Sequence, residues 1–325
     1  MTGPAPHSTY LGVLAMGYVV GIDMAYSITA PSPSGDGKTV QQDIESWLGG
    51  RIPVLFRYTG TGGSAGATPL TTAEIDQIVG DGSILVPVFN QSPVNMGSTG
   101  TYQQGVADAN GATAWAKSIG MPQGVRIAFD VEATSVITAY YIYGLLNGIV
   151  GGAYLSPGFI LYGLCGPTGN VGTALVAASV NNSTMKNGVL GIVPWSASWT
   201  GSGVSLESAR HLSLDIPVPS SLWTGKPAIL QFATEVFGGL CDQNLVDDRL
   251  LIGNNTGFLF GNMEPVSSTV VAATTATTPT VATTISSFPS ATTPNTAISD
   301  LLSSMESQVS ALSTTISKLR STLGG

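Results

Sequence analysis

Residues 126–135 have the sequence RIAFDVEATS, an apolar run that is followed by two carboxylates, Asp130 and Glu132. The run is typical of a buried strand. Strand residues two apart point to the same side, with Cα atoms about 6.5–7 Å apart, so both acids are expected in one small volume. Burying two acids costs folding free energy, so their presence here points to a functional role. The segment therefore indicates both a core strand and a site at the end of that strand.

Seven further runs have the same apolar character and predict strands: GYVVGID (17–23), IPVLFRY (52–58), ILVPVF (84–89), GFILYG (158–163), GIVPWSAS (191–198), AILQFA (228–233) and a weaker GLCDQN (239–244). Helical segments lie between several of them, at 71–79, 101–120 and 136–150. Thr71 and Glu74 have the spacing of a capping box, and Gly120 is suited to end a helix.

Apolar strands that alternate with helices predict a parallel sheet that is buried on both faces. Eight such units in residues 17–263 predict an α/β fold, a (β/α)₈ TIM-type barrel, with a doubly wound sheet as the alternative. No GxGxxG follows the first strand, which disfavours a dinucleotide-binding sheet, and no cofactor is expected.

The chain changes character on both sides of the predicted barrel. Residues 1–16 are expected to be an N-terminal extension. Residues 264–297 are rich in Thr, Ala, Ser and Pro without charge, which predicts an extended linker. Residues 298–325 are expected to form a coiled-coil helix.

The heptad pattern of this last segment is unbroken, with apolar residues at 4-3-4-3 spacing: Ile298, Leu302, Met305, Val309, Leu312, Ile316, Leu319 and Leu323. This spacing predicts self-association through 298–323, as a dimer or a trimer. The alternative is a helix that packs back on the barrel.

Composition excludes several classes of function. The net charge is -8 and the 11 basic residues form no run, so a nucleic-acid partner is not expected. Cys165 and Cys241 are too few for a disulfide scaffold and lack metal-site spacing, which leaves one bridge or two free thiols.

The apolar stretch at 10–22 is too short to span a membrane and lacks the flanks of a Sec-type signal. Extracellular or virion localisation is the expectation.

In a barrel of this type the chemistry lies at the carboxyl ends of the strands. The predicted ends carry acids, amides and aromatic residues: Asp23, Arg57, Tyr58, Asn90, Gln91, Asp130, Glu132, Trp195, Trp199, Gln231, Asp242 and Asn244. The two histidines, His7 and His211, lie outside these ends, which argues against Ser-His or Cys-His catalysis. Aromatic rings stack on sugars, amides bind hydroxyls, and paired acids cleave glycosidic bonds. The set therefore suits carbohydrate.

The segments GIDMAYS, VPVFNQ, 105–134, VPWSASW, ILQFA and CDQNLVDD resemble the DUF1906 glycoside hydrolase-like TIM-barrel family, which is similar to the family 25 lysozymes, or muramidases. The resemblance covers roughly residues 17–255. It implies Glu132 as general acid, with Asp130, Asp23 and Asp242 positioning substrate and reacting groups; Asp247 or Asp248 could align in place of Asp242. Sugar-binding positions would be Tyr58, Asn90, Gln91, Trp195, Trp199 and Gln231.

The expected function is thus a glycan-directed, glycoside hydrolase-like protein that acts on or binds bacterial cell-wall polysaccharide. The low charge, the linker and the heptads point to a bacteriophage virion component, a tail or head fibre, with other virion proteins as further partners. The alternatives are a non-catalytic glycan-binding or structural fibre protein on the same barrel, and a secreted bacterial cell-wall hydrolase. For Trp195, core packing is an alternative to sugar stacking.

Overall fold

The computed structural model describes residues 13–14, 17–60, 68–92, 94, 98–181, 186–197, 228–235, 241–251 and 257–259. The predicted linker and coiled-coil helix lie outside these ranges, as does Trp199, and their assignments stay predictions. Within the predicted N-terminal extension, Val13–Leu14 form the short strand β1, which pairs with β2.

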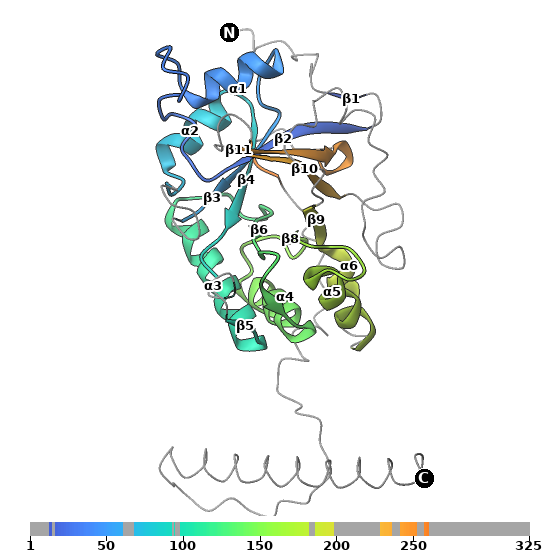
Figure 1. Ribbon diagram of the computed structural model, residues 1–325. Helices are drawn as coiled ribbons and strands as arrows, with labels where there is room; N and C mark the ends of the chain where they lie inside the picture. The colour runs from blue at the N-terminus through green and yellow to red at the C-terminus, as the bar shows by residue number, and fades with distance from the viewer. Residues whose placement is uncertain are drawn as a thin grey trace, which may run out of the picture. The chain divides into compact units, whose positions relative to one another are not determined.

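Eight strands close into a barrel, as the sequence predicts (Figure 1). In order around the ring they are β2 (Tyr18–Met24), β3 (Val54–Tyr58), β4 (Ile84–Phe89), β6 (Ala128–Phe129), β8 (Ile160–Gly163), β9 (Val193–Ala197), β10 (Ile229–Glu235) and β11 (Cys241–Asp247). Pairing of β2 with both β3 and β11 closes the ring, which excludes the open, doubly wound alternative.

The last strand departs from the parallel pattern. β11 runs antiparallel to both β10 and β2, whereas the other barrel pairs are parallel. Only five residues, 236–240, connect β10 to β11, and a parallel crossover needs a dozen or more. The start of β11 therefore lies at the same end of the barrel as the carboxyl ends of the other strands, and this brings Asp242 to that end.

Helices follow the strands and lie outside the ring (Figure 1). They are α1 (Val40–Leu48), α2 (Thr72–Gly80), α3 (Tyr102–Ser118), α4 (Ala139–Gly152), α5 (Asn170–Asn181) and α6 (Lys186–Gly191), with a 3-10 turn, η2 (Asp248–Leu250). Only half of the predicted capping box forms: the Thr71 hydroxyl accepts from the backbone N of Glu74, whereas the Glu74 carboxylate accepts from Ile28 N and Arg57. Gly120 follows α3 with φ 70°, as the sequence predicts. Helix α4 begins at Ala139 because Val136–Ile137 form strand β7, which pairs with β5 (Thr99–Gly100).

Alternate strand residues fill two separate cores. One set faces inward and packs strand against strand, including Val54, Phe56, Val86, Ala128, Ile160, Trp195, Ile229 and Val246. The other set faces the helices, including Ile22, Leu55, Leu85, Phe129 and Leu161. This period-2 alternation fixes which residue of each strand reaches the mouth of the barrel, the end at which the parallel strands finish.

Candidate active site

Polar side chains occupy the next inward positions at the mouth. Tyr58 lies two residues beyond Phe56, and Gln231 two residues beyond Ile229, so each continues an inward row of its strand. The register sets Asp242 opposite Asp23 and Asn244 opposite Gln231. Asp23, Asn90, Asp130, Gln231 and Asn244 are buried, whereas Tyr58, Tyr162 and Asp242 are half-buried. The mouth thus collects carboxyls, amides and phenols from five strands and from the segments that follow β4 and β6.

Asp23 is the centre of a hydrogen-bond network. Its Oδ2 accepts from Gln231 Nε2 at 3.1 Å and from Asn244 Nδ2 at 3.0 Å. Gln231 Nε2 also donates to Asp242 Oδ2 at 2.8 Å, so one amide group serves two carboxyls.

Both amides are held from behind by aromatic side chains. Trp195 Nε1 donates to Asn244 Oδ1 at 2.7 Å, and the Tyr162 hydroxyl donates to Gln231 Oε1 at 2.8 Å. The rings of Trp195 and Tyr162 pack edge to face with centroids 4.7 Å apart. The orientation of each amide at the mouth therefore depends on the barrel interior beneath it.

The Asp130–Glu132 segment follows strand β6, which ends at Phe129. The alternation nevertheless persists beyond the strand, because Val131 packs in the outer core while Asp130 is buried on the inward side. The backbone N of Asp130 donates to the Phe89 carbonyl at 3.2 Å, which ties the segment to β4.

Glu132 is exposed, and its backbone is fixed from helix α5. Asn170 Nδ2 donates to the carbonyl oxygens of Glu132 and Ser135, both at 2.9 Å. The backbone N of Ser135 also donates to the Glu132 carbonyl at 2.9 Å. The turn that carries Glu132 is therefore held at the start of α5 while its carboxyl remains accessible.

Burial gives the carboxyls of the mouth a high proton affinity. Burial raises the pKa of Asp23 to about 8, and the charge of Asp242 adds to the rise. Burial also holds the pKa of Asp130 well above its ordinary range, with Glu132 and Asp23 as further negative neighbours. Asp23 and Asp130 are therefore protonated more readily than ordinary aspartates.

Partial desolvation raises the pKa of Glu132 as well, although its side chain is exposed. Water screens an exposed group, so this rise counts for less than the rise at the fully buried Asp130. Burial, together with the nearby acids, raises the pKa of both Tyr58 and Tyr162, and these phenols keep their protons. The mouth therefore combines an accessible carboxyl with buried groups, and all of them hold their protons more tightly than usual.

Apart from the two tryptophans, the predicted catalytic and sugar-binding residues fall into three groups. Asp23, Asp130, Asp242, Tyr58 and Gln231 converge at the mouth. Asn90 exchanges two hydrogen bonds with the backbone of Gly60, at 3.1 and 3.2 Å, and exposed Gln91 lies against the same glycine. Glu132 stands at the exposed rim.

Trp195 lies in the barrel interior, with 2% of its surface exposed and its ring 4.4 Å from that of Phe56. This position favours the core-packing alternative over sugar stacking. Arg57 points away from the mouth, because its neighbours Phe56 and Tyr58 take the inward face. Its guanidinium forms a buried ion pair with Glu74, with Nε 2.7 Å from Oε1, and donates to the carbonyl of Met24.

Tyr162 and Asn170 are not among the candidates chosen from the sequence. For Tyr162 a signal was present: it stands two residues beyond Ile160, the offset that also brings Tyr58 to the mouth. For Asn170 the sequence offers no such signal, because its two acceptors are backbone carbonyls of a distant turn.

No group of three or more His, Cys, Asp or Glu side chains is arranged to hold a metal ion within the described ranges. Cys165 and Cys241 are buried and free, which settles the alternative of a bridge. None of the helices that the structure describes is long and apolar enough to cross a membrane.

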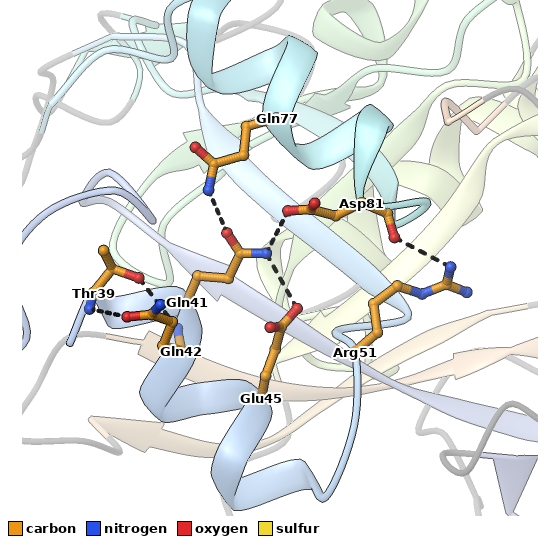
Figure 2. Close-up of a pocket in the computed structure, with 7 residues that line it drawn as sticks. All are labelled: Thr39, Gln41, Gln42, Glu45, Arg51, Gln77 and Asp81. Carbon is orange, nitrogen blue, oxygen red and sulfur yellow. Dashed lines mark hydrogen bonds between the residues drawn. The ribbon is translucent and has the colours of Figure 1, made fainter.

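A separate polar hollow of about 430 Å³ lies between helices α1 and α2 (Figure 2). The amide of Gln41 lies at its wall: Nε2 donates to Asp81 at 2.7 Å and to Glu45 at 3.1 Å, and Oε1 accepts from Gln77 at 2.6 Å. Arg51 donates to the Asp81 carbonyl. These bonds tie the two helices together, and none of the predicted site residues lines the hollow.

Comparisons with known proteins bear on the family and on the barrel fold. The family model of the Rv2525c-like, glycoside hydrolase-like domain matches residues 47–247. No curated protein matches the chain. An uncharacterized B. stearothermophilus protein of known structure shares the fold, with 22% identity and a TM-score of 0.54 over 71% of this chain and 97% of that one.

The modular autolysin LytC from Streptococcus pneumoniae is a more distant match, with 12% identity and a TM-score of 0.40. Its complex with a synthetic peptidoglycan ligand matches with 13% identity and a TM-score of 0.39. Each match covers 70% of this chain and 46% of the autolysin, so the chain spans less than half of that protein.

Proposed function

The chain belongs to the Rv2525c-like glycoside hydrolase-like domain family, and from this premise we propose that it binds bacterial cell-wall glycan at the barrel mouth and hydrolyses a glycosidic bond there. The observation that carries the proposal is the convergence of Asp23, Asp130 and Asp242 beneath an accessible Glu132. Two or more carboxyls of unequal proton affinity are what glycoside hydrolysis requires.

Glu132 is the proposed general acid. It is exposed at the rim and holds its proton more tightly than an ordinary glutamate, so it can protonate the glycosidic oxygen as the bond to the anomeric carbon breaks. Water then adds to the anomeric carbon, and the proton that the water loses returns to a carboxylate of the site. Burial and the negative charge of Glu132 together raise the pKa of Asp130, so the neighbouring acid also holds its proton tightly.

Sugar hydroxyls would meet the polar groups around these acids. Tyr58, Asn90, Gln91 and Gln231 supply hydroxyl and amide groups, and Asp23 and Asp242 are proposed to hold the substrate and the reacting groups. Trp199, outside the described residues, remains the predicted stacking residue. Side chains of this chemistry suit a hydroxyl-rich glycan such as that of peptidoglycan.

The experiment is hydrolysis of purified actinobacterial and other cell walls, followed as clearing in gels and as release of reducing ends. Wild type is expected to cleave at least one wall. Glu132→Gln is expected to lose about 10²–10⁴-fold in rate because it cannot give up a proton. Asp76→Asn, which changes an exposed carboxyl on α2, is the matched control and should retain the wild-type rate.

If wild type clears no wall, hydrolysis is refuted. Sedimentation of the protein with the same insoluble walls then separates the remaining candidates. Binding without cleavage would identify a non-catalytic glycan-binding domain on the same barrel, and absence of binding would leave a structural fibre domain.

We further propose that this barrel is displayed on a bacteriophage tail or head fibre, in the virion or outside the cell. The support is the low content of charged residues, 9%, together with the Thr/Ala/Ser/Pro-rich segment 264–297 and the heptads of 298–323. Self-association and contacts with other virion proteins would then pass through the C-terminal segment. Detection of the chain in purified phage particles by mass spectrometry is the test; its presence only in the medium of uninfected bacteria would favour a secreted bacterial hydrolase.

A further inference from the structure

The two amides at the mouth each have one end toward a carboxyl and the other toward an aromatic side chain. The indole N–H of Trp195 can only donate, so Asn244 must turn its oxygen to the indole and its N–H group to Asp23. The orientation of Asn244 is thus fixed by a partner that cannot reverse its role.

Gln231 is in a different position, because its partner is a hydroxyl. The Tyr162 hydroxyl donates to Gln231 Oε1, and the two N–H groups of Nε2 serve Asp23 and Asp242. In the reversed orientation, the amide oxygen would face the oxygens of both carboxyls, and both would lose the hydrogen bond from Gln231, although Asp23 would keep the one from Asn244. A single amide orientation therefore controls two acids of the mouth.

We propose that Tyr162 is a positioning residue, which acts through Gln231 to keep both amide N–H groups on Asp23 and Asp242. Its hydroxyl lies 2.8 Å from Gln231 Oε1, and its ring packs edge to face with Trp195, so the hydroxyl oxygen is held beside the amide oxygen of Gln231. The proposal deepens the proposed glycan site and rests on it for the functional role of the two carboxyls.

The titration of Asp23 depends on every ionisable group that faces it. These groups come from β3, the segment after β6, β8 and β11: Tyr58, Asp130, Glu132, Tyr162, Cys241 and Asp242. Each of them is neutral or negative. The amide donors of Gln231 and Asn244 are the contacts that favour the ionised form of Asp23.

The test is a carboxyl titration of the full chain, followed by NMR with ¹³C at the aspartate Cγ, with Asp23→Asn and Asp242→Asn to assign the two signals. Tyr162→Phe keeps the ring and removes only the hydroxyl. We expect the midpoint of Asp23 or Asp242 to rise by about one pH unit, because the amide then no longer donates to both carboxyls at all times. Tyr143→Phe, which removes a buried hydroxyl bound to the Ala178 carbonyl, should leave both midpoints unchanged.

A second variant, Gln231→Met, removes the amide itself and should raise the same midpoints by at least as much. If Tyr162 acts through Gln231, adding Tyr162→Phe to Gln231→Met gives no further shift. Unchanged midpoints in Tyr162→Phe, or shifts that add in the double variant, would overturn the proposal. The titration needs no glycan, so its result stays distinct from the success or failure of hydrolysis.

Discussion

Asp23 accepts two amide N–H groups on one oxygen while it remains buried beside Asp242. Because its pKa in the folded state, about 8, lies above the ordinary aspartate value of 3.8, the folded state binds a proton more tightly than the unfolded state. The stabilising contribution of this proton is complete below pH 4 and is lost as pH rises through 8. Ionisation of the buried acids at the mouth thus lowers the stability of the folded state as the pH rises.

Asp23→Asn should reduce this pH dependence. Asparagine resembles the protonated acid in shape, and its carbonyl oxygen can still accept from Gln231 and Asn244. As the pH rises from 5 to 8, we expect the free energy of unfolding of wild type to fall by on the order of 1–3 kcal/mol more than that of the variant. Urea unfolding at the two pH values measures it; an equal loss of stability in both proteins between these pH values would contradict the assignment. Asp130, with a pKa shifted in the same direction, accounts for the slope that remains.

Single residues also show where sequence reasoning reaches its limit. The acids and amides at strand ends could be predicted, because the barrel brings the carboxyl ends of its parallel strands to one mouth. Which residue of each strand faces the barrel interior could not be predicted. Arg57 and Tyr58 are neighbours, and only the inward packing of Phe56 decides that Tyr58 also faces inward. Trp195 poses the same problem, since the sequence does not say that its indole fills the barrel and binds Asn244.

At the scale of elements, the turn after β6 depends on the start of α5. Asn170 holds the carbonyls of Glu132 and Ser135, and Gly163 on β8 lies directly against the same segment. A Cβ at Gly163, where φ is 145°, would come within 2.6 Å of the Val131 carbonyl oxygen. Helix α5 and strand β8 thus fix the place of the proposed acid.

Asn170→Ala should lower the rate of hydrolysis by about tenfold, since it frees the turn that positions Glu132, while it costs stability by only about 1–2 kcal/mol. The loss should fall on kcat more than on KM. Asn147→Ala, which removes an amide bonded to the Tyr102 hydroxyl between α4 and α3, is the matched control. An equal loss of rate in both variants would show that Asn170 acts only through general stability.

The length of one connection explains why the last strand, β11, is antiparallel although a parallel strand is predicted. Continuous apolar runs predict parallel strands, but the short connection between β10 and β11 allows only a hairpin. Strand direction is therefore set by connection length, and the reversal is what brings Asp242 opposite Asp23.

For the molecule as a whole, the heptads predict that copies of the barrel are joined through their C-terminal segments. A chain that ends at Met263 lacks the segment 298–323 and should sediment as a monomer, whereas the full chain should sediment as a dimer or trimer. The truncated chain should retain the wild-type rate on soluble glycan fragments. An unchanged oligomer after truncation would contradict the coiled-coil assignment.

The whole account depends on whether a glycan lies at the barrel mouth with its scissile bond at Glu132. A crystal structure of Glu132→Gln with a bound peptidoglycan fragment measures this directly. We predict a glycosidic oxygen within hydrogen-bond distance of the side chain at position 132, about 2.6–3.2 Å, with sugar hydroxyls on Asp23 or Asp242. A fragment that binds in the hollow between α1 and α2, or anywhere else away from the mouth, would contradict the account.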